Sequence, residues 1–147
     1  MNPDFLDMLS ALSDAGADFL VVGAHAVAVH ATPRATGDLD LWVRPTAENA
    51  RRVWEALEAF GASLQDLELG DLTSDDLVYQ IGVAPSRIDI LTDIGSLDFE
   101  RAWQGRVEVE IGGRTVPVIG RADLIVAKRE VGRPRDLADV AELEGRA

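Results

Sequence analysis

Hydrophobic and polar residues follow two different periods along this chain, and the changes of period mark its elements. Apolar residues recur every three or four positions in some stretches, which predicts helices, whereas strict alternation or short apolar runs predict strands. The helices are expected at residues 4–15, 24–31, 46–60, 97–104, 121–131 and 133–143. The strands are expected at residues 19–22, 37–44, 77–84, 87–91, 106–111 and 114–118. This order predicts an α/β (α+β) fold, a mixed sheet flanked by helices.

Turn residues join two pairs of these strands into antiparallel hairpins. Pro85 and Ser86 separate one pair, and Gly112 and Gly113 separate the other. Tight turns of this kind connect adjacent antiparallel strands. The acidic segment 61–76 shows neither period and is interpreted as a solvated loop, a lid or a disordered stretch.

Three aspartates on the expected strands are the candidate chemistry. Asp38 and Asp40 lie two residues apart on one strand and therefore share a face, while Leu39 between them points to the core. Two neighbouring carboxylates repel each other unless a hard cation such as Mg²⁺ joins them. Asp89 alternates with isoleucines on a later strand. The alternative is three exposed strand aspartates, but aspartate is disfavoured in strands.

The stretch around these residues resembles a known signature. Residues 23–25 read Gly-Ala-His, a short helix follows, and 33–36 (Pro-Arg-Ala-Thr) precede the Asp-Leu-Asp of 38–40. This resembles the nucleotidyltransferase fold of the DNA polymerase beta superfamily, and especially its small bacterial members, the AbiEii-type toxins and the minimal nucleotidyltransferases. That signature has a glycine pair, of which Ala24 replaces the second glycine.

The resemblance implies transfer of a nucleoside monophosphate from an NTP, such as ATP, to an acceptor hydroxyl, with a possible role in a toxin–antitoxin pair. Two-metal phosphoryl transfer needs carboxylates that gather two cations. Asp38, Asp40 and Asp89 would be both catalytic and metal-binding residues, with Mg²⁺ (or Mn²⁺) as cofactor. Asp38 and Asp40 would bind both ions, and Asp89 would join the ion on the acceptor side.

Several residues are candidates for holding the nucleotide. The start of the helix after Gly23 offers free backbone N–H groups for a phosphate, and Ala24 is small enough to allow close approach. His25 would donate to a phosphate oxygen or be purely structural. Arg34 suits phosphate recognition, or is a solvated loop cation. The nucleotide-binding candidates are Gly23, Ala24, His25, Arg34, Thr36 and Lys128.

Lys128 belongs to a second motif near the end of the chain. In the small nucleotidyltransferases a helical lysine is followed by Arg-x-Lys-Asp-Leu at the start of the next helix. Lys128, Arg133 and Asp136 match this pattern, and Arg135 replaces the second lysine. By resemblance Lys128 would reach the triphosphate, although it could be a plain surface lysine. Asp136 is functional or only caps its helix.

Composition narrows the alternatives. The 147 residues fit one domain, 1–147, and contain no cysteine, which removes thiolate metal sites and disulfides. The net charge of −12 disfavours general nucleic-acid binding. Neither a signal peptide nor an apolar run of membrane length is present, so a cytoplasmic protein without membrane contact is expected.

Two function classes remain open from the sequence. The first is the metal-dependent nucleotidyltransferase, acting on an RNA end, a protein or a small molecule. The second is a non-catalytic regulatory module that binds nucleotide or a partner on the same fold. In either case a partner protein or a second copy of the chain is a possible partner, and Trp42 or Trp103, if exposed, would line a dimer contact.

Overall fold

The computed structural model describes residues 1–33 and 37–146. Six strands form one sheet in the order β3-β4-β2-β1-β6-β5. The strands are β1 Phe19–Val22, β2 Leu39–Val43, β3 Val78–Ile81, β4 Ile88–Leu91, β5 Val107–Ile111 and β6 Arg114–Val118. The helices are α1 Pro3–Asp14, α2 Gly23–His30, α3 Ala47–Phe60, α4 Phe99–Gln104, α5 Arg121–Val131, α6 Pro134–Leu143 and the short 3₁₀ helix η1 Leu69–Thr73. The predicted α/β fold with a mixed sheet is confirmed.

The pairing of the central strands is what positions the site. β2 runs antiparallel to β1 and parallel to β4, so residues of β2 and β4 in register present their side chains on the same face. β1 pairs with β6 in parallel. The two outer strands, β3 and β5, return as antiparallel partners of β4 and β6, and both predicted hairpins are confirmed.

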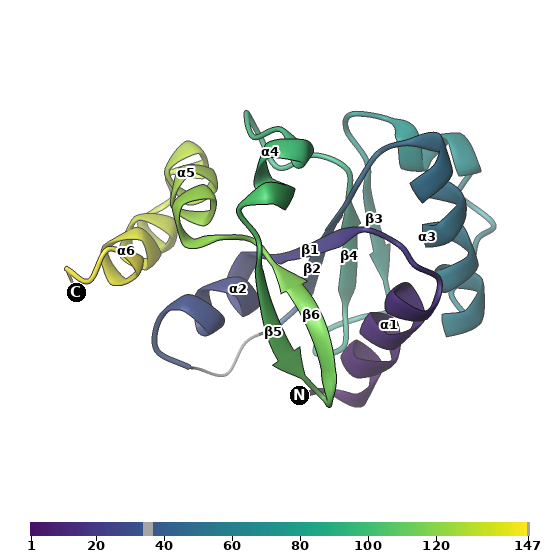
Figure 1. Ribbon diagram of the computed structural model, residues 1–147, viewed down its shortest axis with the longest axis horizontal. Helices are drawn as coiled ribbons and strands as arrows, with labels where there is room; N and C mark the ends of the chain where they lie inside the picture. Colours follow the sequence, from purple (N-terminus) through teal and green to yellow (C-terminus); the bar gives the residue numbers. More distant parts are fainter. Residues whose placement is uncertain (34–36, 147) are drawn as a thin grey trace.

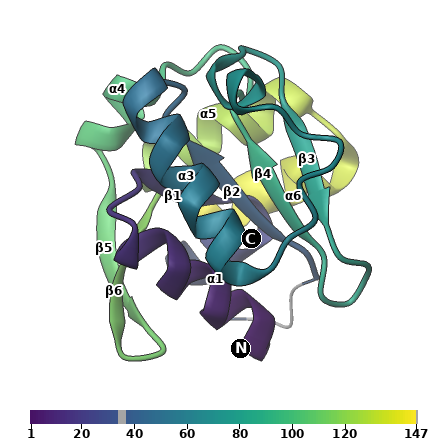
Figure 2. The same ribbon diagram turned by 90° about the vertical axis from the view of Figure 1, so that its right-hand side faces the viewer.

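Helices cover both faces of the sheet. α1 and α3 pack on one face, and α2, α5 and α6 lie on the other (Figure 1). Figure 2, turned by 90°, shows α1 and α3 in front of the sheet with α5 and α6 behind it. α5 and α6 form a hairpin that packs on α2. The motif at residues 23–40 and the C-terminal motif at Lys128–Asp136 therefore come together on the face of the sheet that α2, α5 and α6 cover.

The core lies under the central strands, where β1 is buried along its whole length. Leu39, Leu41 and Val43 are fully buried, as the alternation predicted. Trp42 is also buried, at 1% exposure, and its indole Nε1–H donates to the carbonyl of Thr92 at 3.2 Å. The expectation that Trp42 could be exposed in a dimer contact is therefore wrong.

The reason for this burial is that α4 covers the end of β2. Phe99 of α4 packs edge-to-face on Trp42 with ring centroids 5.1 Å apart. Trp103 stacks on Phe99 at 5.8 Å and carries the guanidinium of Arg106 over its ring. Because both faces of β2 are covered at this end, alternation alone could not tell the buried tryptophan from an exposed one.

The ends of α3 and the acidic segment show how local chemistry sets the boundaries. Thr46 caps α3 by accepting from the backbone N–H of Asn49 at 3.3 Å, and Gly61 ends it with φ 91°. The segment after Gly61 contains η1, and its Leu67 and Leu72 are buried. The acidic segment is therefore anchored to the core through its leucines, and η1 packs on α3.

Within the described residues no helix is both long and apolar enough to cross a membrane.

Candidate active site

The site begins at the edge between β2 and β4. Asp40 of β2 lies opposite Asp89 of β4 in the parallel register. Asp38 precedes β2 and lies opposite Arg87, because the backbone N–H of Leu39 donates to the carbonyl of Arg87 at 3.1 Å. Three carboxylates and one guanidinium thus gather on two adjacent strands. We call these four residues, Asp38, Asp40, Arg87 and Asp89, the sheet wall.

Arg87 is shared between two of the three carboxylates. Its Nη2 lies 2.6 Å from Oδ2 of Asp38, and its Nε lies 3.2 Å from Oδ1 of Asp89. The second contact is close but is no hydrogen bond, since Arg87 Nε and Asp89 Oδ1 are both buried and neither forms a hydrogen bond with any described residue. The two groups are therefore poorly aligned. One guanidinium therefore does not satisfy the carboxylates that surround it.

Asp40 carries the electrostatic consequence. The pKa of Asp40 is raised to about 7 by burial first, then by the charge of Asp89, a hydrogen bond with Asp89 and the charge of Asp38, while the charge of Arg87 acts against them. A carboxyl group so placed holds a proton near neutrality unless another cation arrives. The sheet wall is short of positive charge.

Gly23 brings the turn between β1 and α2 against Asp40. Its φ is 67°, in the left-handed region that glycine adopts readily. A Cβ at this position would clash with the carboxylate of Asp40. The first turn of α2, whose backbone N–H groups have no partner within the helix, therefore starts next to Asp40. Ala24 and Asp40 both line the cavity described next.

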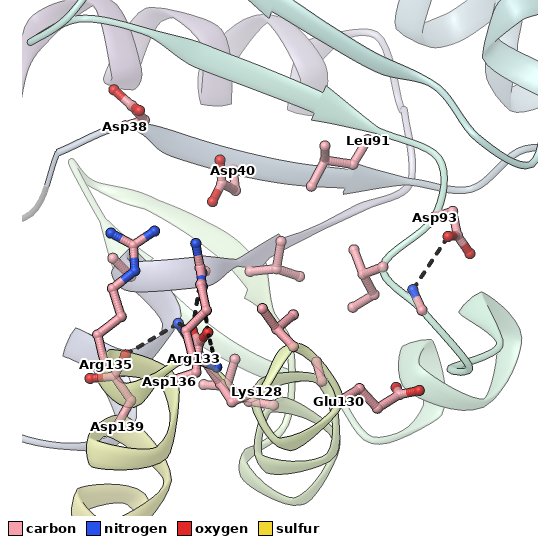
Figure 3. Close-up of a pocket in the computed structure, with 18 of the residues that line it drawn as sticks. Asp38, Asp40, Leu91, Asp93, Lys128, Glu130, Arg133, Arg135, Asp136 and Asp139 are labelled. Carbon is pink, nitrogen blue, oxygen red and sulfur yellow. Dashed lines mark hydrogen bonds and ion pairs between the residues drawn. The ribbon is translucent and has the colours of Figure 1, made fainter.

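A cavity of about 930 Å³ separates this edge of the sheet from the C-terminal helices. Asp40 of β2 and Asp38 just before that strand line it on one side, and Lys128, Arg133 and Arg135 line it from α5 and the start of α6 (Figure 3). Figure 3 shows Asp40 on the strand above these helices, and it shows the carboxylate of Asp38 pointing away from them. Acidic and basic side chains thus face each other across one cavity.

The helical side has its own charge network, which we call the helix wall: Lys128, Arg133, Arg135, Asp136 and Asp139. Lys128 Nζ lies 3.4 Å from Asp136 Oδ1 and 3.2 Å from Asp139 Oδ2. Arg133 Nε donates to Asp136 Oδ2 at 2.6 Å, and the backbone N–H of Arg133 donates to the same oxygen at 3.2 Å.

Asp136 is the centre of that network. It is 1% exposed, and its side chain caps the start of α6. The hydrogen bond from Arg133 lowers the pKa of Asp136 to about 2, with the charges of Lys128 and Arg133 acting in the same direction against the effect of burial. The capping role weighed from the sequence is present, and Asp136 also holds Lys128.

Arg135 differs from its neighbours. It lies on the first turn of α6, is exposed and lines the cavity. Its side chain forms no hydrogen bond or ion pair with the described residues, unlike Lys128 and Arg133. The helix wall therefore presents one guanidinium that a bound anion could take without breaking an internal contact.

His25 lies at the side of the site. Its Nε2 is 3.2 Å from the carbonyl oxygen of Gly37, and its ring packs edge-to-face on Phe5 with centroids 5.5 Å apart. Burial lowers the pKa of His25 despite the contact with Gly37. His25 is not among the residues that line the cavity. The geometry supports the structural alternative, in which His25 fixes the backbone just before Asp38.

The sequence-predicted site residues are therefore partly brought together. Gly23, Ala24, Asp38, Asp40 and Lys128 line one cavity. Asp89 lies beside Asp40 but is not a lining residue. Arg34 and Thr36 lie outside the described residues.

Sequence reasoning missed two members of this charge arrangement. Arg87 received no role, although the alternation Arg87-Ile88-Asp89 places it on the face of Asp89. Asp139 was also missed, and its signal was the spacing of three residues from Asp136, which puts both carboxylates on one face of a helix.

The described residues contain no group of three His, Cys, Asp or Glu side chains arranged to hold a metal ion. The donor chemistry nevertheless suits a hard cation, because the sheet wall offers carboxylate oxygens and one of them, Asp89 Oδ1, is buried without a hydrogen bond. Asp38 is turned toward Arg87, with its Oδ2 2.6 Å from Arg87 Nη2.

No family model matches the sequence, and no curated protein matches it. Solved structures do. The lincomycin-bound lincosamide antibiotic adenylyltransferase LnuA is 13% identical, with a TM-score of 0.65 over 100% of this chain and 98% of its own. The antibiotic-resistance factor ANT(2'')-Ia is 16% identical, with a TM-score of 0.62 over 95% of this chain and 80% of its own.

A putative nucleotidyltransferase from Thermotoga maritima is 15% identical, with a TM-score of 0.58 over 100% of this chain and 96% of its own. At these identities the similarity establishes the fold alone. The chain adopts the nucleotidyltransferase fold, as the motif at 23–40 predicted. A specific likeness to AbiEii-type toxins stays a prediction.

Proposed function

We propose that this protein is a metal-dependent nucleotidyltransferase that moves a nucleoside monophosphate from an NTP to an acceptor hydroxyl. One observation carries the proposal: an under-neutralised carboxylate wall faces a cationic helix wall across a single cavity. A metal–triphosphate complex has the matching charges, with cations for the first wall and anionic oxygens for the second. The shared fold with nucleotidyltransferases supports the same conclusion.

Asp38, Asp40 and Asp89 would hold the Mg²⁺ or Mn²⁺. Their carboxylates supply the oxygen ligands that these cations prefer, and burial together with the neighbouring carboxylates raises the pKa of Asp40, an effect that a bound cation would oppose. Bound metal would neutralise charge on the triphosphate and favour the deprotonated acceptor hydroxyl. Gly23 keeps the turn before α2 close enough for this region to be shared with a phosphate group.

The phosphates would be held from two sides. The start of α2 would offer its backbone N–H groups from one side, because Gly23 and Ala24 line the cavity together with Asp40. Arg135 supplies a guanidinium with no competing ion pair among the described residues, and Lys128 stays a candidate although two carboxylates already hold it. His25 is left with a structural role.

The transfer itself needs one bond to form and one to break. The acceptor oxygen attacks the α-phosphorus of the NTP, and the bond from that phosphorus to the oxygen bridging to the β-phosphate breaks. Pyrophosphate leaves with the bonding electrons, and the acceptor proton passes to the carboxylate of Asp89, the residue on the acceptor side. The role of these residues is to gather charge and to orient the reactants.

We further propose ATP as the nucleotide and a small molecule as the acceptor. LnuA is named as a lincosamide adenylyltransferase, and ANT(2'')-Ia was solved in complex with adenylyl-2''-tobramycin, so two fold neighbours handle small hydroxyl-bearing molecules. The net charge of −12 disfavours an RNA acceptor. A toxin–antitoxin role, and a partner protein or second copy that completes the site, stay predictions.

The test is incubation with each α-labelled NTP and Mg²⁺ or Mn²⁺, together with hydroxyl-bearing antibiotics, total RNA or total protein. Wild type is compared with Asp40→Asn, which removes a carboxylate of the sheet wall, and with Asp93→Asn, an exposed acid on the cavity rim outside that wall. We expect label transfer to fall by about 10²–10³-fold in Asp40→Asn, as for loss of a group that stabilises transition-state charge. Asp93→Asn should keep wild-type transfer.

Equal transfer by Asp40→Asn and wild type would overturn the assignment of the site. Transfer to RNA or protein alone would overturn the choice of acceptor and keep the reaction class. The position of the label on the gel or chromatogram separates these cases.

A non-catalytic nucleotide-binding module is the second candidate, and one observation favours it. Arg87 already pairs with two of the three carboxylates, as a structural arrangement without metal would need. Under this alternative NTP binds by calorimetry, Asp40→Asn leaves the affinity unchanged, and label is transferred to none of the acceptors.

A further inference from the structure

Arg87 occupies a place in the sheet wall that neither the sequence motif nor the proposed reaction explains. It lies next to Asp38 across the β2–β4 pairing and two residues before Asp89 on its own strand. Its side chain is 35% exposed, whereas that of Asp89 is 11% exposed. It therefore reaches from the edge of the site into the carboxylate cluster.

The two ion pairs of Arg87 are unequal. Nη2 lies 2.6 Å from Asp38 Oδ2, a strong charge-assisted contact. Toward Asp89 the contacts are 3.2 Å from Nε and 3.5 Å from Nη2, and Nε makes no hydrogen bond within the described part of the chain. The guanidinium is thus drawn mainly to Asp38 and only loosely aligned on Asp89.

The same preference accounts for the direction of Asp38. Asp38 and Asp40 are two residues apart, yet their carboxylates point in different directions (Figure 3). Asp38 faces the guanidinium of Arg87, and the described residues contain no three-carboxylate arrangement that could hold a metal. A cation held by both Asp38 and Asp40 requires Asp38 to leave Arg87.

We propose that Arg87 is the resident counter-cation of this site, a positioning residue that competes with the divalent cation for Asp38. In the metal-free protein it holds Asp38 and limits repulsion among the three carboxylates. When metal binds, Asp38 turns from Arg87 toward Asp40, and the guanidinium stays with Asp89. Arg87 thereby sets the affinity for free metal. This inference rests on the proposed function, because it assumes that these carboxylates bind metal.

The experiment is a Mn²⁺ titration of EDTA-stripped protein without nucleotide, followed by electron paramagnetic resonance or calorimetry. Arg87→Gln removes the competing charge, so we expect Mn²⁺ to bind about tenfold more tightly than to wild type, because a unit positive charge a few ångströms away repels the cation. Arg87→Lys keeps the charge and should bind close to wild type.

Arg114→Gln is the matched control. Arg114 forms an exposed ion pair with Asp14, with 2.8 Å between Nη1 and Oδ1, and it does not line the cavity. It should leave Mn²⁺ affinity unchanged. Unchanged or weaker binding by Arg87→Gln would overturn the inference, because it would mean that Arg87 orients the ligands and does not compete with the metal.

A second measurement does not depend on Arg87→Gln folding. In wild type, the Nε–H resonance of Arg87 should move on addition of diamagnetic Mg²⁺, while that of Arg114 stays in place. An Arg87 resonance that does not respond to saturating Mg²⁺ contradicts the exchange of partners.

The two proposals can fail separately. Tighter Mn²⁺ binding by Arg87→Gln, with no label transferred by wild type, supports the inference and overturns the proposed reaction. Label transfer with Mn²⁺ affinity insensitive to Arg87 does the reverse. No Mn²⁺ binding by wild type or by Arg87→Gln overturns both.

Discussion

The two walls of the cavity handle charge in opposite ways. In the sheet wall Arg87 pairs with only two of the three carboxylates, Asp38 and Asp89, and the pKa of the third, Asp40, is raised to about 7. In the helix wall Asp136 receives contacts from both Lys128 and Arg133, and its pKa is lowered to about 2. The first wall lacks cations, and the second is nearly satisfied within itself.

This difference separates residues that hold the structure from residues poised for a ligand. Asp136 and Lys128 are largely buried, and their ion pair ties α5 to α6. Asp40 lies at the cavity with its charge uncompensated, and Arg135 lies on the opposite wall with no ion pair to any residue that the structure describes. The unsatisfied groups of both walls face the same space, where a metal–nucleotide would satisfy them together.

The largest expected effect comes from changing Gly23, which joins the sheet wall to α2. Gly23→Ala forces a non-glycine residue to φ 67° and drives its Cβ into the carboxylate of Asp40. Left-handed strain costs about 1–2 kcal/mol and overpacking about 1–3 kcal/mol, so we expect a loss of about 3 kcal/mol in the free energy of unfolding. Urea denaturation measures it.

Gly16→Ala is the control for strain alone. Gly16 has a similar φ of 71°, but a Cβ there would meet nothing within 4 Å. It should lose only the strain, about 1–2 kcal/mol. Combining Gly23→Ala with Asp40→Ala should recover the part due to the clash. Equal losses in the free energy of unfolding for Gly16→Ala and Gly23→Ala would show that the close approach of Gly23 to Asp40 adds no cost beyond the backbone strain.

The walls should also differ in how they respond to pH. Between pH 3.8 and about 7 folded Asp40 keeps a proton that the unfolded chain releases, so the free energy of unfolding falls as pH rises through this window. Each pKa unit is worth about 1.4 kcal/mol, and solvent screening at this partly exposed group reduces the total to about 2 kcal/mol. Asp136 acts with the opposite sign, and its stabilisation is lost as pH falls from 3.8 to about 2.

Thermal or urea unfolding in EDTA from pH 2 to pH 8 measures both limbs. Asp40→Asn should flatten the decline between pH 4 and 7 and leave the acid limb in place. Asp136→Asn should lose stability near neutrality and remove part of the acid limb. If the free energy of unfolding rose from pH 4 to 7, and rose equally in wild type and in Asp40→Asn, the raised pKa of Asp40 would be contradicted.

The elements and the core of this fold follow from local signals in the sequence. Thr46 and Gly61 mark the ends of α3, and the alternation of 38–43 places Leu39 and Leu41 in the core. Both hairpins were predicted because their turns contain the residues that such turns need. These features depend on neighbours within a few positions, which is why the sequence alone reveals them.

The site was less predictable because its contacts join distant segments. That Asp40 lies opposite Asp89 depends on β2 and β4 pairing in parallel across about fifty residues, which alternation does not state. The role of Arg87 depends on the same pairing. Trp42 looked exposed until α4 was placed over β2. Electrostatic competition among such groups appears only when the sheet order is known.

The smallest expected effect concerns Arg135, which would sharpen the comparison within the helix wall. Arg135→Ala should weaken ATP binding by about tenfold, which is about 1.4 kcal/mol, and change the free energy of unfolding by less than about 0.5 kcal/mol. Calorimetric titration and urea denaturation measure the two quantities.

Arg129→Ala is the charge-matched control, because Arg129 is exposed on α5, pairs with Glu144 and does not line the cavity. It should leave ATP affinity unchanged. The opposite outcome would be a Lys128→Ala variant that loses ATP affinity at unchanged stability, together with an Arg135→Ala variant that binds ATP like wild type. Lys128 would then be the phosphate ligand in spite of its ion pairs, and the helix wall, like the sheet wall, would use its charged network to bind the ligand.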